Sequence, residues 1–219
     1  MRSWWRHQFR SPLNPPKGEV VWRLVFGVIC FVSFFVLQPF ELIKPFEPFK
    51  LLTLLLQYKH LLPSDFHPDS RVWIYQSDRL FTEPEQIEID ELLHQFTNSW
   101  TSHGAKVKGF GKLFFNQFVV LLADETASGV SGCSTDSSVR LIKEIENKYK
   151  ADLFNRQNLA FFTGENIIQI PLSKLNEAIS NNLINTETSY FNNVVLSKKE
   201  LEKKWIVPLK NSWLQNKVQ

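Results

Sequence analysis

Residues 118–149, FVVLLADETASGVSGCSTDSSVRLIKEIENKY, contain the pattern that decides the fold of this chain. An uninterrupted apolar run starts at Phe118 and predicts a buried strand that ends near Glu125. Small and hydroxyl residues follow, and from 137 to 149 apolar residues recur at helical spacing. The stretch therefore predicts a buried strand, a loop and an amphipathic helix, an arrangement in which the loop is a candidate site.

Further elements are predicted on both sides of this stretch. RVWIYQ (71–76) is typical of a strand, and Thr82 and Glu85 form a capping box at the start of a helix that Gly104 is expected to end. Two strands around Phe115–Asn116 predict a hairpin. The remaining predicted elements are a second hairpin (159–162 with 167–172) and short helices near 173–181 and 197–205.

The order β-α-β-β-α-β predicts an α+β domain over residues 69–219. It favours a ferredoxin-like split βαβ layout, which is an antiparallel sheet with helices on one face. Near the C-terminus, Trp205 and Trp213 are expected to pack the tail against the domain, because tryptophan is mostly a packing residue.

The longest apolar run, VVWRLVFGVICFVSFFVLQPF at residues 20–40, predicts one N-terminal membrane helix before this domain. Between positions 24 and 37 the only polar side chain is Ser33. Tryptophans on the basic side of the run are typical of anchors at a membrane interface. Two other interpretations stay open, a cleaved signal peptide and an extension that enters no membrane.

The basic charge of the chain lies around this run. Residues 1–62 carry eight Lys and Arg against three acids, whereas the rest carries 17 against 19, so we expect no nucleic-acid partner. Residues 1–19 form a basic segment before the membrane helix. Residues 41–68 form a connector with an amphipathic helix, which lies either on a membrane surface or against the domain.

The loop after the buried strand carries the candidate site. A cysteine at a helix entrance can act as a nucleophile, so the candidate catalytic residues are Cys133, His103 as a base and Asp124 as a helper. The candidate binding residues are Ser131, Gly132, Ser134, Asp136 and Ser137. The alternative is that these small residues cap the helix and allow close packing, with no ligand.

No metal and no cofactor are predicted. The five histidines and two cysteines show neither HxxxH nor CxxC spacing. GAKVKGFGKL at 104–113 is not a phosphate-binding loop, because Leu113 stands where Ser or Thr is needed and the segment reads as a strand. Its glycines are expected to let the strand twist or form a bulge.

Four segments carry a resemblance to a known family: RVWIYQSDRLFTEPE, NSWTSHGAKVKG, the 118–149 stretch with its SGCSTDSSV core, and FNNVVLSKKELEKKWIVPLKNSW. Through them residues 64–219 resemble a family of small bacterial proteins frequently labelled "ABC transporter ATPase". That label implies ATP hydrolysis, but the chain has neither a Walker A motif nor an ABC signature, so the resemblance implies no catalytic residues. Residues 20–40 resemble the first membrane span of LytTR-type membrane-attached regulators.

Together these features predict a membrane-anchored α+β accessory or interaction domain, with the membrane and a protein as partners. The alternative is a thiol-dependent or small-ligand-binding domain that uses the Cys133 loop. The expected location is the bacterial inner membrane, crossed once. The positive-inside rule places the domain outside the cytoplasm, whereas the family resemblance implies the cytoplasm, and both sides stay open.

Overall fold

The computed structural model describes residues 58–126, 129–164 and 166–218. The chain divides into two units, Met1–Pro45 and Phe46–Gln219, and every described residue belongs to the second unit. The predicted basic segment 1–19 and membrane helix 20–40 therefore lie outside the described residues. Within the described part of the chain, no helix is long and apolar enough to span a membrane.

The described end of the predicted connector packs on the domain. Tyr58 and Leu62 are buried, and the ring of Tyr58 meets that of Trp205 edge to face at 5.1 Å between centroids. The Tyr58 hydroxyl also donates a hydrogen bond to the carbonyl of Leu201 at 3.1 Å. At this end, the amphipathic pattern therefore reflects contact with the domain.

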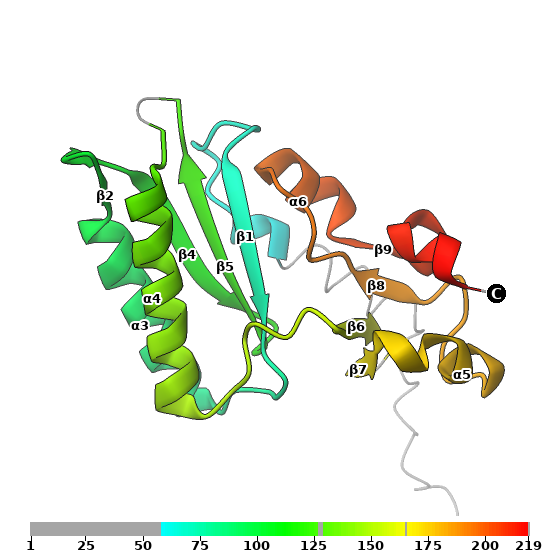
Figure 1. Cartoon of the computed structure of the whole chain (residues 1–219). Coiled ribbons are helices and arrows are strands. Elements are labelled where there is room, and N and C mark those ends of the chain that lie inside the picture. Colours follow the sequence, from blue (N-terminus) through cyan, green and yellow to red (C-terminus); the bar gives the residue numbers. More distant parts are fainter. Residues whose placement is uncertain (1–57, 127–128, 165, 219) are drawn as a thin grey trace, which may run out of the picture. The chain divides into compact units, whose positions relative to one another are not determined.

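The first sheet consists of three antiparallel strands in the order β1-β5-β4. Their bounds are β1 (Arg71–Gln76), β4 (Lys108–Phe114) and β5 (Phe118–Asp124). Helices α3 (Glu83–Ser99) and α4 (Gly132–Tyr149) cover one face of this sheet, as Figure 1 shows. A short hairpin of β2 (Thr101–Ser102) and β3 (Ala105–Lys106) follows α3.

Strand β5 is the buried centre of this sheet, since all of its residues are buried. Val119 and Leu121 join the apolar cluster formed with α3 and α4. Val120 and Leu122 join a second cluster on the opposite face. A strand covered on both faces needs apolar side chains at every position, and this explains the uninterrupted apolar run in the sequence.

The second sheet has four antiparallel strands in the order β7-β6-β8-β9. Their bounds are β6 (Asn158–Phe162), β7 (Ile167–Pro171), β8 (Ser189–Phe191) and β9 (Ile206–Pro208). The helical elements of this half are η1 (Leu172–Lys174), α5 (Leu175–Ser180), α6 (Lys198–Lys204), η2 (Leu209–Asn211) and η3 (Trp213–Lys217). Side chains of α5, η2 and η3 form a third apolar cluster with β6 and β7.

An aromatic group joins the two sheets into one core. Phe118 of β5 stacks on Phe191 of β8, with 4.7 Å between ring centroids. The buried ring of Trp205 meets both of them edge to face, at 5.6 and 5.9 Å. Because these side chains come from both sheets, neither sheet buries its apolar face without the other.

The prediction of an α+β fold with antiparallel sheets is confirmed. The three strands β1, β5 and β4 with α3 and α4 have the arrangement of a split βαβ unit. The strand expected to complete a ferredoxin-like sheet, β6, instead pairs with β7 and β8. The outer edge of β1 is occupied by the segment before α6, since Val72 N–H donates to the carbonyl of Leu196 at 3.0 Å.

Local predictions agree with the structure except at two helix ends. The capping box is confirmed, with Thr82 N–H donating to Glu85 at 2.8 Å, and so is the hairpin turn at Phe115–Asn116, where both residues have positive φ. The first helix ends at Ser99 rather than at Gly104, because Trp100 turns into extended backbone. The second begins at Gly132 rather than at 137, five residues before its apolar periodicity starts.

Candidate functional site

The predicted loop site is largely the first turn of α4. Ser131 caps this helix by accepting a hydrogen bond from the Ser134 N–H, at 3.3 Å. The buried Ser134 hydroxyl donates to the carbonyl of Thr101 at 2.8 Å, and its own carbonyl accepts from the Trp100 indole at 3.1 Å. Ser137 donates back to the Ser134 carbonyl at 2.7 Å. These hydroxyls join α4 to the β2–β3 hairpin, which is the capping and packing role that the sequence left as the alternative.

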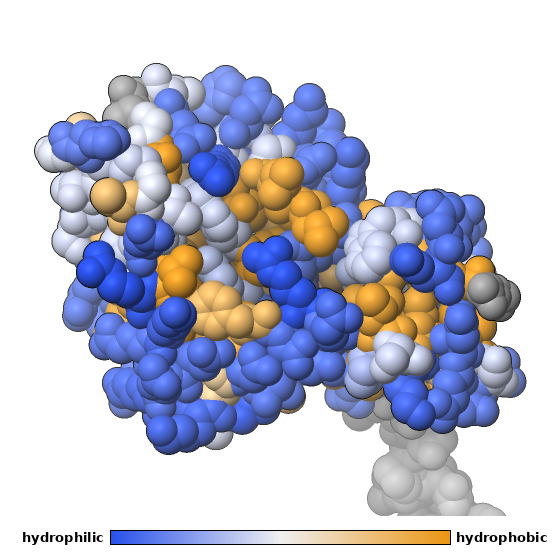
Figure 2. Space-filling model, viewed as in Figure 1, coloured by the Kyte–Doolittle hydropathy of each residue, from blue (hydrophilic) through white to orange (hydrophobic). Residues whose placement is uncertain are grey.

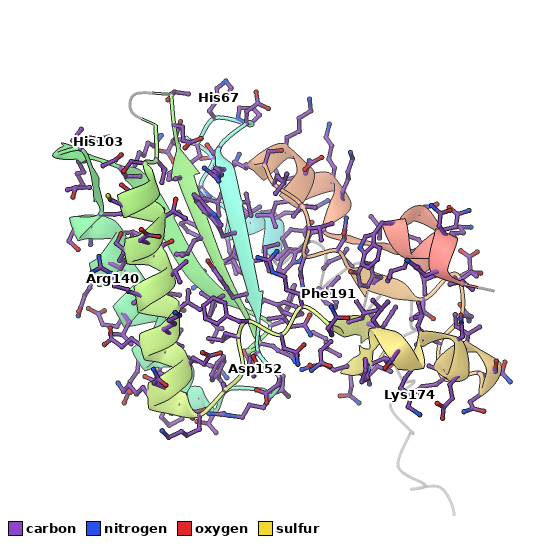
Figure 3. The ribbon with its side chains drawn as sticks, viewed as in Figure 1. His67, His103, Arg140, Asp152, Lys174 and Phe191 are labelled. Carbon is purple, nitrogen blue, oxygen red and sulfur yellow. The ribbon has the colours of Figure 1, made fainter. Side chains whose placement is uncertain are left out.

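The exposed members of the predicted site are His103, Gly132, Cys133 and Asp136. His103 lies in the β2–β3 turn with φ of 50°, at the tip of the hairpin that contacts the start of α4 (Figure 3). Among the described residues no hydrogen bond links the Cys133 sulfur to His103 or to a carboxylate. In this structure Cys133 therefore has no hydrogen-bonded base, either in His103 or in Asp124.

Asp124 has its own set of partners. Its carboxylate accepts from the Thr126 hydroxyl at 2.7 Å and from the His67 N–H at 3.2 Å, and Lys108 Nζ lies 3.4 Å away. Burial opposes the charge, but these hydrogen bonds outweigh it and lower the pKa of Asp124 to about 2. Asp124 therefore stays ionised around pH 7 and ties the segment before β1 to the end of β5, and a carboxylate with so low a pKa is a weak base.

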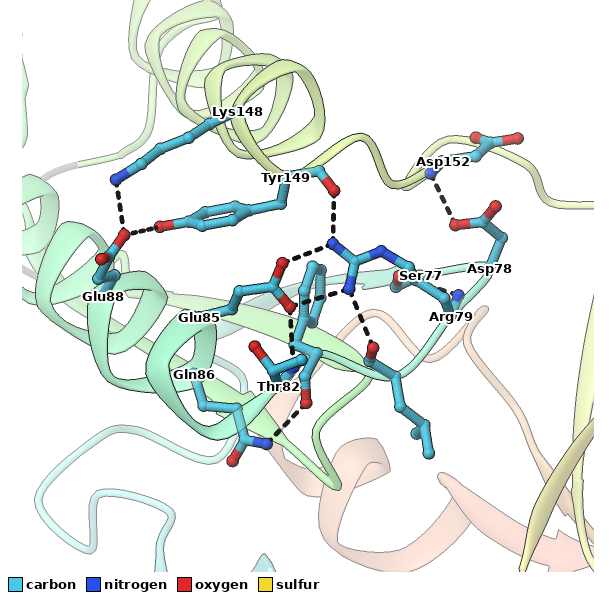
Figure 4. Close-up of polar contacts among 12 residues, drawn as sticks. Ser77, Asp78, Arg79, Thr82, Glu85, Gln86, Glu88, Lys148, Tyr149 and Asp152 are labelled. Carbon is cyan, nitrogen blue, oxygen red and sulfur yellow. Dashed lines mark hydrogen bonds and ion pairs between the residues drawn. The ribbon is translucent and has the colours of Figure 1, made fainter.

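A second ionic network joins the start of α3 to the end of α4, as Figure 4 shows. The Arg79 guanidinium donates to both carboxylate oxygens of Glu85, at 2.9 and 2.7 Å, and to the carbonyl of Tyr149. Glu88 accepts from the Tyr149 hydroxyl at 2.8 Å and pairs with Lys148 at 2.9 Å. Because these groups satisfy one another across the start of α3 and the end of α4, we assign them a structural role.

A hollow lined by aromatic and amide side chains lies where the two sheets meet, away from the predicted loop. Its cavity volume is about 70 Å³. Its lining residues are Ile74, Tyr75, Gln76, Leu153, Phe154, Asn155, Arg156, Asn158, Leu159, Tyr190, Phe191, Asn193, Val194 and Trp213. They come from β1, the segment between α4 and β6, β6 itself, β8, the segment after β8, and η3.

The floor of this hollow is a paired amide network. Asn193 donates to the side-chain oxygen of Gln76 at 2.8 Å and accepts from the Trp205 indole at 3.0 Å. Gln76 in turn donates to the carbonyl of Asn158 at 3.2 Å. Since Gln76 and Trp205 are buried, these bonds hold the segment after β8 against β1 and the start of β6.

The walls combine aromatic rings with one cation. Tyr75 meets Phe154 edge to face at 5.5 Å between centroids. Burial raises the pKa of Tyr75, and the positive charge of Arg156 opposes that shift. Burial also raises the pKa of Tyr190 to about 12, against a hydrogen bond with Trp213. Both tyrosines therefore stay neutral around pH 7, and Arg156 supplies the charge of the hollow.

Sequence reasoning missed this hollow because its walls lie far apart along the chain. Trp205 is buried as expected, whereas Trp213 is 40% exposed and lines the hollow. Within the described part of the chain no group of His, Cys, Asp and Glu side chains could hold a metal ion.

No protein-family model, curated protein or solved structure matches this chain.

Proposed function

We propose that this chain is a membrane-anchored accessory domain that binds another protein through the hollow between its two sheets. The observation that supports this proposal is the set of exposed apolar side chains around the hollow. Val194 (55% exposed), Trp213 (40%) and Phe154 (37%) line the hollow, and Leu196 (71%) follows two residues after Val194. Apolar side chains gathered around a concavity are typical of an interaction site, whereas single exposed ones need no explanation.

The composition of this surface also favours a protein partner. Tryptophan, tyrosine and arginine are enriched among the residues that contribute most to protein interfaces, and Trp213, Tyr75, Tyr190 and Arg156 all line the hollow. A floor that is already hydrogen-bonded reduces the entropy lost on binding. In this proposal the ferredoxin-like part of the fold, from β1 to α4, holds in place the side of the hollow that β1 forms.

The proposed anchor is the apolar run at 20–40, with the basic segment 1–19 on the cytoplasmic side of a bacterial inner membrane. A run of this length is just enough to cross about 30 Å of hydrocarbon. This orientation places the domain on the far side of the membrane. The family resemblance of residues 64–219 favours the cytoplasm instead, so the two orientations are separate versions of the proposal.

Carbonate extraction of membranes that contain the full chain tests the anchor. We expect the protein to stay in the membrane pellet, because an apolar helix within the bilayer is not released at high pH. A matched chain with Val28 and Val32 replaced by Asp should move to the supernatant, since each central Asp costs about 2.5–3.5 kcal/mol of insertion free energy. Release of the unaltered chain would show that residues 20–40 do not anchor it.

Site-specific photo-crosslinking in membranes tests the interaction. A photoreactive residue at position 213 should give a discrete adduct with another protein. The matched control is position 143, where an exposed lysine lies on the solvent side of α4, and it should give none. The same adducts from both positions, or none from position 213, would contradict the proposed binding surface.

A further inference from the structure

The charge of the hollow restricts what can occupy it. Of the described residues that line it, Arg156 is the only one that carries a charge at neutral pH. No carboxylate among the described residues forms an ion pair with Arg156, whose side chain is exposed. Asn155, Asn158 and the tyrosine hydroxyls are neutral, so the hollow presents one cation surrounded by aromatic and aliphatic walls. The complementary ligand carries one negative group next to apolar groups.

The apolar surface extends beyond the hollow in one direction. Val194 belongs to the lining, and Leu196 follows two residues later in the segment that runs along the outer edge of β1. Figure 2 shows apolar atoms gathered over β1 and beside α6 on the same side of the domain. A surface that continues past the hollow along a strand edge fits a length of chain better than a compact small molecule.

We propose that this surface binds an extended segment of a partner protein in which an Asp or Glu stands two positions from a large apolar residue on either side, because alternate side chains of an extended segment lie on one face. The carboxylate pairs with the Arg156 guanidinium, whose planar donors match a carboxylate in two-pronged geometry. One of the apolar side chains enters the hollow between Phe154 and Trp213, and the other lies on Val194 and Leu196. This inference rests on the proposed function and adds the chemistry of the partner.

Two matched peptides test the assignment. They are the N-acetylated, C-amidated pentapeptides Phe-Ala-Glu-Ala-Phe and Phe-Ala-Gln-Ala-Phe, which place residues 1, 3 and 5 on one face when extended and differ in the charge of the central side chain. Binding is followed on the full chain in detergent micelles through the seven ¹⁵N-labelled tryptophan indoles, and Trp213→Phe identifies the signal of Trp213. We expect both peptides to shift that signal and the Glu peptide to bind about 2- to 5-fold more tightly, the range of an exposed ion pair.

Two arginine variants show whether Arg156 is responsible. Arg156→Gln should remove the preference for the Glu peptide and leave the affinity of the Gln peptide unchanged. The matched control is Arg140→Gln, which removes another exposed arginine, from α4 and outside the hollow, and should keep the preference (Figure 3). The preference should also shrink as salt is raised, because exposed charges are screened.

Three results would overturn the inference. They are equal affinity for the two peptides, a preference that survives Arg156→Gln, and peptide binding that leaves the Trp213 signal unshifted. If either of the first two occurs while position 213 still crosslinks to a partner, the acidic recognition is wrong and the proposed function stands. If crosslinking fails as well, the binding surface itself is wrong.

Discussion

At the scale of single residues, Gly109 shows why the second residue of β4 carries no side chain. A Cβ built on Gly109 would lie 2.8 Å from Cε3 of Trp100, whose indole is buried and hydrogen-bonded to α4. The glycine therefore permits the end of α3 to approach the sheet. The sequence suggested glycines that ease a twisted strand, but the requirement here is space for an aromatic ring.

We expect Gly109→Ala to lower the free energy of unfolding by about 1–3 kcal/mol, because overpacking forces buried groups to move. Gly132→Ala is the matched control, since a Cβ at Gly132 meets nothing within 4 Å. It should leave stability unchanged or slightly raised, as alanine is the better helix former. Denaturant unfolding of both variants measures the difference, and equal stability would contradict the close packing of Trp100 on β4.

The charge of Glu85 makes the free energy of unfolding depend on pH. Hydrogen bonds from Arg79, and then from Thr82, lower its pKa from the usual 4.5 to about 2. A carboxyl whose pKa is lower in the folded chain stabilises the fold fully above the unfolded value and loses this contribution as pH falls toward the folded value. Its contribution should therefore be complete above about pH 5 and should disappear between about pH 4.5 and 2.

We accordingly expect Glu85→Gln to destabilise the protein at pH 7 and to make little difference near pH 2. Denaturant unfolding at a series of pH values measures this change. Glu144→Gln is the control, because Glu144 is exposed in the middle of α4 and should show no such pH-dependent difference. A Glu85→Gln effect that is the same at every pH would mean that the Arg79 pair does not stabilise the fold.

At the scale of elements, the start of α4 is set by a cap rather than by apolar periodicity. Ser131 is extended, with φ of −75° and ψ of 168°, and its hydroxyl satisfies the N–H of Ser134. Ser131 N–H in turn donates to the Ser102 hydroxyl at 3.1 Å. The helix can therefore begin before its apolar face does, which places Cys133 inside the first turn.

Ser131→Ala should cost about 0.5–2 kcal/mol of stability, because one N–H at the helix start loses its acceptor. Ser131→Asp keeps an acceptor at the same place and should be close to the unaltered chain. Cys133→Ser is the matched control in the same turn and should not change unfolding, since its side chain is exposed. Thermal unfolding of the three variants measures these effects, and a neutral Ser131→Ala would show that the cap contributes nothing.

At the scale of the whole described domain, the aromatic group around Trp205 makes the two sheets one folding unit. Phe118, Phe191 and Trp205 belong to a cluster with side chains from both sheets. If the second sheet separated from the first, the side chains of this cluster would become exposed to solvent. The two sheets are therefore expected to unfold together, with one transition seen by all probes.

Trp205→Ala should reduce the free energy of unfolding by about 3–5 kcal/mol, the usual cost of truncating a fully buried aromatic side chain. Trp213→Ala is the control, because that ring is partly exposed at the rim of the hollow, and it should cost far less. Near-ultraviolet and far-ultraviolet circular dichroism of the unaltered chain should give coincident transitions. Two separate transitions would show that each sheet has an independent core.

Much of the local structure was predictable because neighbouring residues determine it. The apolar run of β5, the capping box of Thr82 and Glu85, and the turn at Phe115–Asn116 depend on propensities within a few positions. The helix before Trp100 was predicted too long because the burial of that indole against α4 involves residues far along the chain. Most of the residues predicted as the candidate loop belong instead to the first turn of α4, and the partners that satisfy their hydroxyls were not predictable.

The sequence by itself determined the main strands and helices from β1 to α6 but not the short strands β2, β3, β8 and β9, and it determined the apolar run at 20–40. Only the tertiary structure decided that β6 leaves the first sheet, that Asp124 pairs with Lys108, and that a hollow forms between the sheets. Those features depend on contacts such as Gln76 with Asn193, which are 117 positions apart. Local periodicity carries no information about such pairs, because they form only when the shared aromatic core brings the two sheets together.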